Sequence, residues 1–131
     1  MVLGAEGVQI GTRFALTEES SASSVFKDYC LSLGEGDTKL LLKKLAPTRL
    51  VKNAFREAVE KAEDSGASAE DLRTLLGRGR AKKGIFEGDL EEGELEIGQV
   101  SAIISRRQSV AEVMNELVAA YQRAAKKDYL F

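Results

Sequence analysis

A glycine-bounded segment near the start of the chain has the residue types of a phosphate-binding turn. Apolar residues alternate in it with small or polar ones, which predicts a short, buried parallel strand. Where such a strand ends, backbone N–H groups are free, and parallel α/β folds bind phosphate at that edge. A plain strand-to-helix turn has the same pattern, so the residues leave both interpretations open. The segment reads Gly7-Val8-Gln9-Ile10-Gly11, followed by Thr12.

A second group of residues that could contact an anion is the only basic cluster of the sequence. It consists of Arg78, Arg80, Lys82 and Lys83. Such a cluster is either a solvated helix end or loop, or a contact for an anionic ligand group.

The chain contains one cysteine, Cys30, and no histidine. A single cysteine excludes an intramolecular disulfide, and without a histidine to activate it Cys30 is expected to pack as a small apolar residue on a helix. Ser-His and Cys-His nucleophiles and His-ligated metal sites are excluded as well. We therefore predict no catalytic residue and no metal site, so that a cofactor or another chain must supply any reactive group.

The composition is that of a soluble globular protein with room for one domain. Hydrophobic residues make up 44% of the 131 residues and charged residues 31%, and the net charge is −2. Acidic and basic residues are interleaved, which argues against nucleic acid or an anionic membrane as a partner. The sequence has no apolar run of roughly 20 residues and no secretory signal at its start. A cytoplasmic location is expected.

Most of the chain has the apolar spacing of amphipathic helices. Capping residues and glycines predict where these helices begin and end. Residues 38–42 are instead predicted as a short strand, and residues 82–89 as a glycine-punctuated loop before an acidic turn at 90–93. The helices are expected after the serines that follow Thr17 and up to Leu33, from about Leu50 to Asp64, from Ser68 to Leu76, from Glu94 or Leu95 to Ile104, and from Ser109 onward with a capping box to Glu112.

Several segments in succession resemble one family of flavin enzymes. The order and spacing of the matching segments agree over nearly the whole chain. The chain resembles the C-terminal part of the nitronate monooxygenase (2-nitropropane dioxygenase) and FMN-dependent enoyl-acyl-carrier-protein reductase family. The matching segments are Gly4–Phe14, Pro47 with Arg49–Asn53, Phe86–Asp89, Gly93 and Gly98–Ala102.

This resemblance implies a cofactor, FMN, and gives roles to two segments. It implies that the backbone around Gln9, Ile10, Gly11 and Thr12 helps to hold the FMN phosphate. It also implies that Gly98-Gln99 lies close to the flavin, where a helix N-terminus suits an anionic or carbonyl group. A capped helix that only packs on the barrel is the alternative for Gly98-Gln99.

For the fold, the resemblance implies an α/β parent with a TIM-barrel-like (β/α)₈ architecture. A complete barrel takes roughly 250 residues, so this chain is expected to be mostly α-helical with one or two short strands from the barrel's end. We expect residues 1–16 to form the last barrel strand and phosphate loop, 17–93 a helical insertion or cap, and 94–131 the C-terminal helices.

For the function, the resemblance implies oxidation of a nitronate with molecular oxygen, and enoyl-thioester reduction is the alternative within the family. The isolated chain is expected to be inactive. Two other interpretations stay open: a helical interaction module without a cofactor, and one subunit of a split enzyme whose missing barrel another chain supplies. An unpaired barrel strand exposes backbone donors and acceptors, so we expect self-association or partial disorder near residues 1–16.

Overall fold

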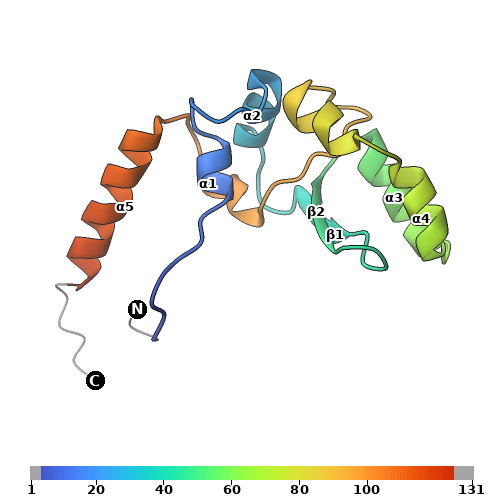
Figure 1. The fold of residues 1–131 in the computed structure, drawn as a ribbon, viewed down its shortest axis with the longest axis horizontal. Helices are drawn as coiled ribbons and strands as arrows, with labels where there is room; N and C mark the ends of the chain where they lie inside the picture. The colour runs from blue at the N-terminus through green and yellow to red at the C-terminus, as the bar shows by residue number, and fades with distance from the viewer. Residues whose placement is uncertain (1–3, 126–131) are drawn as a thin grey trace.

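The computed structural model describes residues 4–125, and these form an arch of short helices around one hairpin (Figure 1). Helix α5 (Val110–Ala125) and the segment that leads into α1 (Thr12–Ala15) form one end of the arch, and α3 (Ala54–Asp64) and α4 (Ala69–Leu76) form the other. No helix in residues 4–125 is long and apolar enough to cross a membrane. In chain order the elements are α1 (Thr12–Ala15), α2 (Ser24–Leu31), β1 (Thr38–Leu41), β2 (Thr48–Val51), α3 (Ala54–Asp64), α4 (Ala69–Leu76), the π-helical turn η1 (Lys82–Phe86), the 3₁₀ turn η2 (Gln99–Ile103) and α5 (Val110–Ala125).

The helix starts predicted at Ser68 and Ser109 are confirmed. The Ser68 hydroxyl accepts from the backbone N–H of Asp71, and the Asp71 carboxylate accepts from the N–H of Ser68, which is a complete capping box for α4. Ser109 and Glu112 form the same reciprocal pair before α5. Such caps satisfy N–H groups that the first turn of a helix leaves without a partner.

The strand predicted at residues 38–42 is confirmed as β1, but its partner was not predicted. β1 pairs antiparallel with β2, with Thr38 opposite Val51 and Leu41 opposite Thr48. The expected helix start near Leu50 is wrong, because Leu50 and Val51 belong to β2. The Asn53 side chain caps α3 by accepting from the N–H of Arg56 at 2.8 Å, so the helix begins at Ala54, four residues after Leu50.

β2 separates two apolar clusters, because neighbouring residues of a strand point to opposite faces. Leu50 faces one cluster and Val51 the other, and both are almost fully buried. The first cluster is Leu41, Leu42, Leu50, Phe55, Val59 and Leu72, under α3 and α4. The second is Leu16, Phe26, Cys30, Leu33, Val51, Leu95, Ile97 and Ile104, around α2.

The buried strand expected at Gly7–Gly11 is not formed. These residues run as an extended segment toward α1, and the Val8 side chain is 79% exposed. A parallel strand needs a neighbour to accept and donate its backbone hydrogen bonds, and no strand among residues 4–125 lies beside this segment. The strands among residues 4–125 form an antiparallel hairpin within residues 38–51, and the described residues show no barrel.

The helix expected from Glu94 or Leu95 to Ile104 is also wrong in its first half. Leu95 and Ile97 are buried while Glu96 between them is exposed, which is the two-residue period of a strand. The segment hydrogen bonds along β2, with the Val51 N–H donating to the Leu95 carbonyl at 2.9 Å. Only η2, after Gly98, is helical, because the contacts to β2 hold the preceding residues extended.

The expected loop at residues 82–89 contains the helical turn η1, although the acidic turn that follows it is confirmed. Two glycines explain the packing of η1. A Cβ atom on Gly93 would lie 2.2 Å from the Cα of Gly84, and one on Gly84 would lie 2.7 Å from the side chain of Leu95. Both positions therefore need glycine because two backbone segments touch there.

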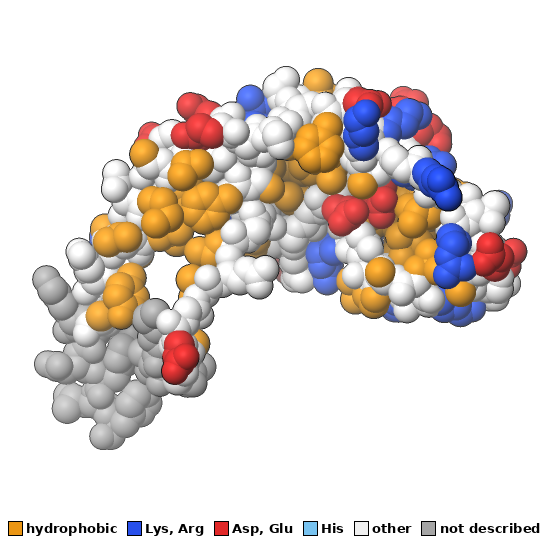
Figure 2. Space-filling model, in the orientation of Figure 1, with side chains coloured by type: hydrophobic (Ala, Val, Ile, Leu, Met, Phe, Trp, Pro, Cys, Tyr) orange, Lys and Arg blue, Asp and Glu red, His pale blue; other side chains and the backbone are white. Residues whose placement is uncertain are grey.

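Helix α5 presents most of its apolar residues to solvent. Val113 is buried, whereas the side chains of Met114, Val118 and Tyr121 are between 46% and 53% exposed. Apolar side chains gather over α5 and near α1, and a hollow lies between α5 and the segment that leads into α1 (Figure 2). We call the exposed apolar residues of this end of the arch the open face. They are Val8, Val100, Ile103, Met114, Val118 and Tyr121.

Candidate functional site

The predicted phosphate turn opens directly into α1, whose N-cap is Gly11. The φ of Gly11 is −94°, which any residue can adopt, and no atom lies within 4 Å of the position of a Cβ there. The first N–H groups of a helix have no partner within the helix. Gly11 therefore leaves open space beside backbone N–H groups, and this is the geometry that close approach of an anion requires.

The structure joins this turn to the second predicted segment. The hydroxyl of Thr12 accepts a hydrogen bond from the backbone N–H of Gly98 at 3.0 Å, across 86 positions of sequence. Gly11, Thr12 and Gly98 line one surface depression of about 380 Å³, together with Arg49 and Glu96. The backbone of the predicted phosphate turn and the backbone of Gly98 are thus neighbours.

The other candidate residues lie in two separate depressions. Gln9 and Ile10 line a groove of about 610 Å³ that α5 borders through Leu117. Gln99 lines a depression on the other side of η2, beside the loop that precedes β1. Val100 and Ile103 border both, so η2 forms the ridge between them. Gln9 and Gln99 are therefore not brought together.

Arg13, which follows the turn, is committed to a polar network with α5. Its guanidinium donates to the side-chain carbonyl of Gln108 and forms a 3.0 Å ion pair with Glu116. Hydrogen bonds from Gln108 and from Arg13, with the positive charge of Arg13, lower the pKa of Glu116. The Arg13 guanidinium therefore already has a carboxylate partner, whereas Arg49, in the depression beside Gly11, hydrogen bonds to Thr38.

Residues around this network fix α1 against α5. The Glu19 carboxylate accepts from the N–H of Val110 at 3.0 Å, at the start of α5, and the N–H of Glu18 donates to the carbonyl of Gln108. Lys27 is buried, and its ammonium donates to the carbonyls of Glu18 and Ser20 at 3.2 and 2.7 Å. The loop after α1 is thereby tied to α2 and α5.

Three of the four residues of the basic cluster, Arg80, Lys82 and Lys83, serve packing and ion pairs. Arg80 lies over the ring of Phe55, with 4.5 Å from the guanidinium carbon to the ring centroid, and donates to the carbonyl of Glu92. Lys82 pairs with Glu87, and Lys83 pairs with Asp89 at 2.8 Å. The interpretation as a structural, solvated cluster is therefore favoured over an anion site.

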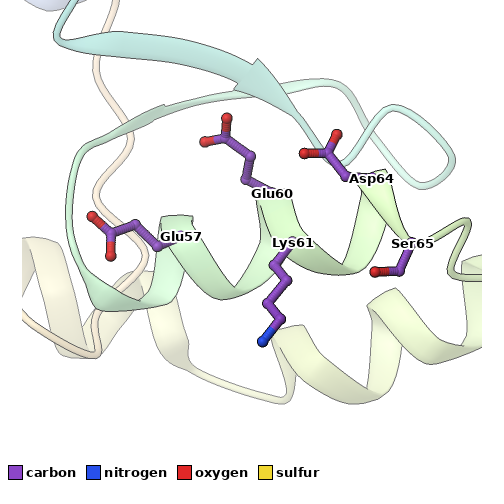
Figure 3. Close-up of a pocket in the computed structure, with 5 residues that line it drawn as sticks. All are labelled: Glu57, Glu60, Lys61, Asp64 and Ser65. Atoms are coloured by element: carbon purple, nitrogen blue, oxygen red, sulfur yellow. The ribbon is translucent and has the colours of Figure 1, made fainter.

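Cys30 and the acidic residues of α3 are titratable groups that do not form a catalytic or binding site. Cys30 is fully buried, and burial raises the pKa of its thiol to about 12, as expected for a packing residue. A shallow depression on α3 is lined by Glu57, Glu60 and Asp64, but Lys61 points away from Glu60 and Asp64 (Figure 3), and Glu60 pairs with Lys39. Among residues 4–125, no group of His, Cys, Asp and Glu could hold a metal ion.

Comparison of the fold with solved structures gives a close likeness. FabK from Thermotoga maritima is similar over 95% of this chain and 40% of its own, with a TM-score of 0.84 and 27% identity. A variant of the same protein is similar over 95% of this chain and 37% of its own, with a TM-score of 0.78 and 25% identity. The fold is therefore that of one part of a larger protein.

The sequence comparisons name the family. The family model described as nitronate monooxygenase matches residues 1–120. A probable nitronate monooxygenase of Bacillus subtilis (strain 168) is 31% identical over 118 residues, which are 89% of this chain and 34% of the relative. The chain belongs to the nitronate monooxygenase family of FMN-dependent oxidoreductases, and it spans about a third of the length of this curated relative.

Proposed function

We propose that this chain contributes part of an FMN phosphate site in a flavin-dependent oxidoreductase. The observation that carries the proposal is the contact between Thr12 and Gly98, since it joins the two segments that the family resemblance associates with FMN. Gly11 adds an open approach to the N-terminus of α1. In this proposal Gln9, Ile10, Gly11 and Thr12 provide the phosphate turn.

The residues of the turn fit the phosphate of FMN through their backbone N–H groups, and not through a charged side chain. FMN, when bound, supplies the electron transfer of the reaction, while the protein binds and orients it. The N–H groups after Gly11 would hold phosphate oxygens, and Gly98 and Gln99 would face the flavin from η2. No side chain here is proposed as a catalytic residue.

Titration of the chain with FMN, followed by flavin fluorescence, tests the phosphate turn. Gly11→Asp places a carboxylate in the open space and should weaken binding by at least about tenfold, because it repels the phosphate. Gly7→Asp is the matched control, since Gly7 also has no atom within 4 Å of its Cβ position but lies before the turn. Equal loss in both variants, or no FMN binding by the unchanged chain, would overturn the proposed site.

For the reaction, we propose nitronate oxidation with molecular oxygen, which the family match and the curated relative support. Enoyl-thioester reduction is the alternative that the resemblance leaves. Because the chain spans about a third of that relative, we expect no turnover by the chain with FMN alone. Oxygen consumption dependent on an alkyl nitronate would contradict this, and so would oxidation of NADH dependent on an enoyl thioester.

The open face supports a proposal about partners. Contiguous exposed apolar residues mark surfaces that another element or chain covers. We propose that the remainder of a family barrel, supplied by another chain or sequence, covers the open face, and that the isolated chain self-associates through it. In sedimentation velocity, Ile103→Lys should shift the chain toward monomer, since Ile103 is 81% exposed. A sharp monomer peak for the unchanged chain would contradict this.

A helical interaction module is the second candidate function, and the exposed apolar side of α5 is the observation in its favour. It differs from the main proposal in one measurable respect, because a module of this kind is folded and indifferent to flavin. Saturable FMN binding that depends on Gly11 would exclude it.

A further inference from the structure

Gly98 is a glycine for a steric reason. Its φ of −71° and ψ of 152° are those of ordinary extended backbone, which any residue adopts. A Cβ atom at this position, however, would lie 2.3 Å from the hydroxyl oxygen of Thr12 and 3.6 Å from the Thr12 Cβ. The hydroxyl of Thr12 therefore occupies the space of the missing side chain.

The Thr12 hydroxyl can still donate a hydrogen bond. It accepts from the Gly98 N–H, and no acceptor for its own hydrogen is found among residues 4–125. Thr12 is only partly buried and lines the depression that Gly11 and Gly98 share. A hydroxyl can donate and accept at once. An acceptor placed at the phosphate turn could therefore bind Thr12 while Thr12 binds Gly98.

The turn η2 couples the position of Gly98 to that of Gln99. Gly98 is the N-cap of η2, and its carbonyl accepts from the N–H of Ser101 at 3.0 Å. Ser101 is fully buried and accordingly fixed, whereas Gln99 is exposed at the start of the turn. A change at the Gly98 N–H is thus transmitted to Gln99 through one peptide bond.

We infer that Thr12 is a positioning residue, which sets the place of Gly98 and Gln99 relative to the phosphate turn and makes that segment respond to occupancy of the turn. The inference rests on the proposed FMN site for its ligand, but the link between Thr12 and Gly98 is testable without one. It goes beyond a backbone phosphate site, because it gives the Thr12 side chain a role that serine can replace and valine cannot.

Thermal unfolding of a set of variants tests the link in the free protein. Gly98→Ala should lower Tm by roughly 5 °C or more, since the new methyl group overlaps the Thr12 hydroxyl. Thr12→Ala removes that oxygen and leaves a 3.6 Å contact, so adding Gly98→Ala to Thr12→Ala should change Tm by less than about 2 °C. In a Thr12→Val background the clash remains, and the full loss should return. Additive losses in all backgrounds would overturn the inference.

Amide hydrogen exchange tests the response to occupancy. With FMN present, residues 98–104 should exchange more slowly in the unchanged chain and in Thr12→Ser. In Thr12→Val the Gly98 amide should exchange about tenfold faster in the free protein, because one hydrogen bond is lost, and FMN should not restore it. Thr48→Val is the matched control, since the Thr48 hydroxyl lines the same depression but donates to the Ala46 carbonyl.

The outcomes separate the two proposals. FMN binding without any change at residues 98–104 would overturn the inference and leave the phosphate site intact. Absence of FMN binding would overturn the phosphate site, while the unfolding series would still decide whether Thr12 positions Gly98. Equal effects of Thr12→Val and Thr48→Val on Gly98 exchange would contradict the positioning role.

Discussion

The two ends of the arch use their apolar side chains differently. At one end, β1, β2, α3 and α4 enclose a core of their own, in which Val59 and Leu72 are fully buried. At the other end, α5 buries Val113 and exposes Met114, Val118 and Tyr121. All three helices that contain these residues have amphipathic spacing. The apolar pattern therefore predicts that one face of a helix will be covered, but not which part of a protein covers it.

The candidate site lies at the end with the open face. The Gln9–Arg13 segment, η2 and α5 border one groove, and the exposed residues Val100 and Ile103 lie on its rim. The enclosed end holds itself together by local packing, including Leu42, which is buried in spite of a φ of +57° that side chains rarely adopt. We expect the enclosed end to carry most of the stability, and the open end to carry the proposed function.

A matched pair of valines gives the largest expected difference between the two ends. Val59→Ala should lower the free energy of unfolding by about 2 to 3 kcal/mol, because two buried methyl groups are removed and a cavity remains. Val118→Ala should change it by no more than about 0.5 kcal/mol, because Val118 is 47% exposed. Urea unfolding of both variants measures the difference. Similar losses would show that α5 is packed in solution and that the two ends are alike.

The junction between the two ends should be sensitive to pH. Glu94 is 7% exposed, and burial, with the negative charge of Glu96, raises the pKa of its carboxyl from 4.5 to about 7. Between these two values the folded protein keeps a proton that the unfolded chain has lost. Stability should therefore fall as pH rises from about 4.5 to 7, by on the order of 2 kcal/mol, and this term should change little above pH 7.

Urea unfolding at a series of pH values checks this expectation. Glu94→Gln should remove the fall, because the amide cannot ionise. Glu91→Gln, which changes an exposed carboxyl of the preceding turn, is the control and should keep the fall. A pH profile that is the same in Glu94→Gln and in the unchanged chain would contradict the assignment to Glu94.

Two capping boxes allow a finer comparison of the ends. Ser68→Ala before α4 should cost about 1 kcal/mol, because an N–H of the first turn loses its acceptor. Ser109→Ala before α5 should cost less, about 0.5 kcal/mol, since the Glu19 carboxylate also accepts at the N-terminus of α5. A larger loss at Ser109 than at Ser68 in the same unfolding assay would show that Glu19 does not share the capping.

Local features of the chain were predictable from sequence wherever a local cause decided them. Capping at Ser68 and Ser109 and the strand at residues 38–42 follow from neighbouring residues. The extended segment at Leu95 and Ile97 was missed, because its hydrogen bonds go to β2, more than 40 residues earlier. The strand at Gly7–Gly11 was predicted from a pattern that needs neighbouring strands, which residues 4–125 do not contain.

The candidate site was predictable only in its parts. The glycine pattern and the family resemblance indicated Gln9–Thr12 and Gly98-Gln99 as two segments. Their contact through the Thr12 hydroxyl spans 86 positions, and no local pattern encodes it. The pairing of Arg13 with Glu116 was missed for the same reason, although it commits the guanidinium that follows the turn to a carboxylate of α5.

The most direct test of the proposed phosphate turn is a comparison of FMN with riboflavin, which lacks the phosphate, by amide chemical shifts of the ¹⁵N-labelled chain. We expect FMN to shift the amide signals of Gly11, Thr12 and Gly98 in a saturable manner, and riboflavin to leave the signals of Gly11 and Thr12 unchanged. Equal shifts with both flavins, or shifts confined to residues away from the turn, would contradict the proposed phosphate turn.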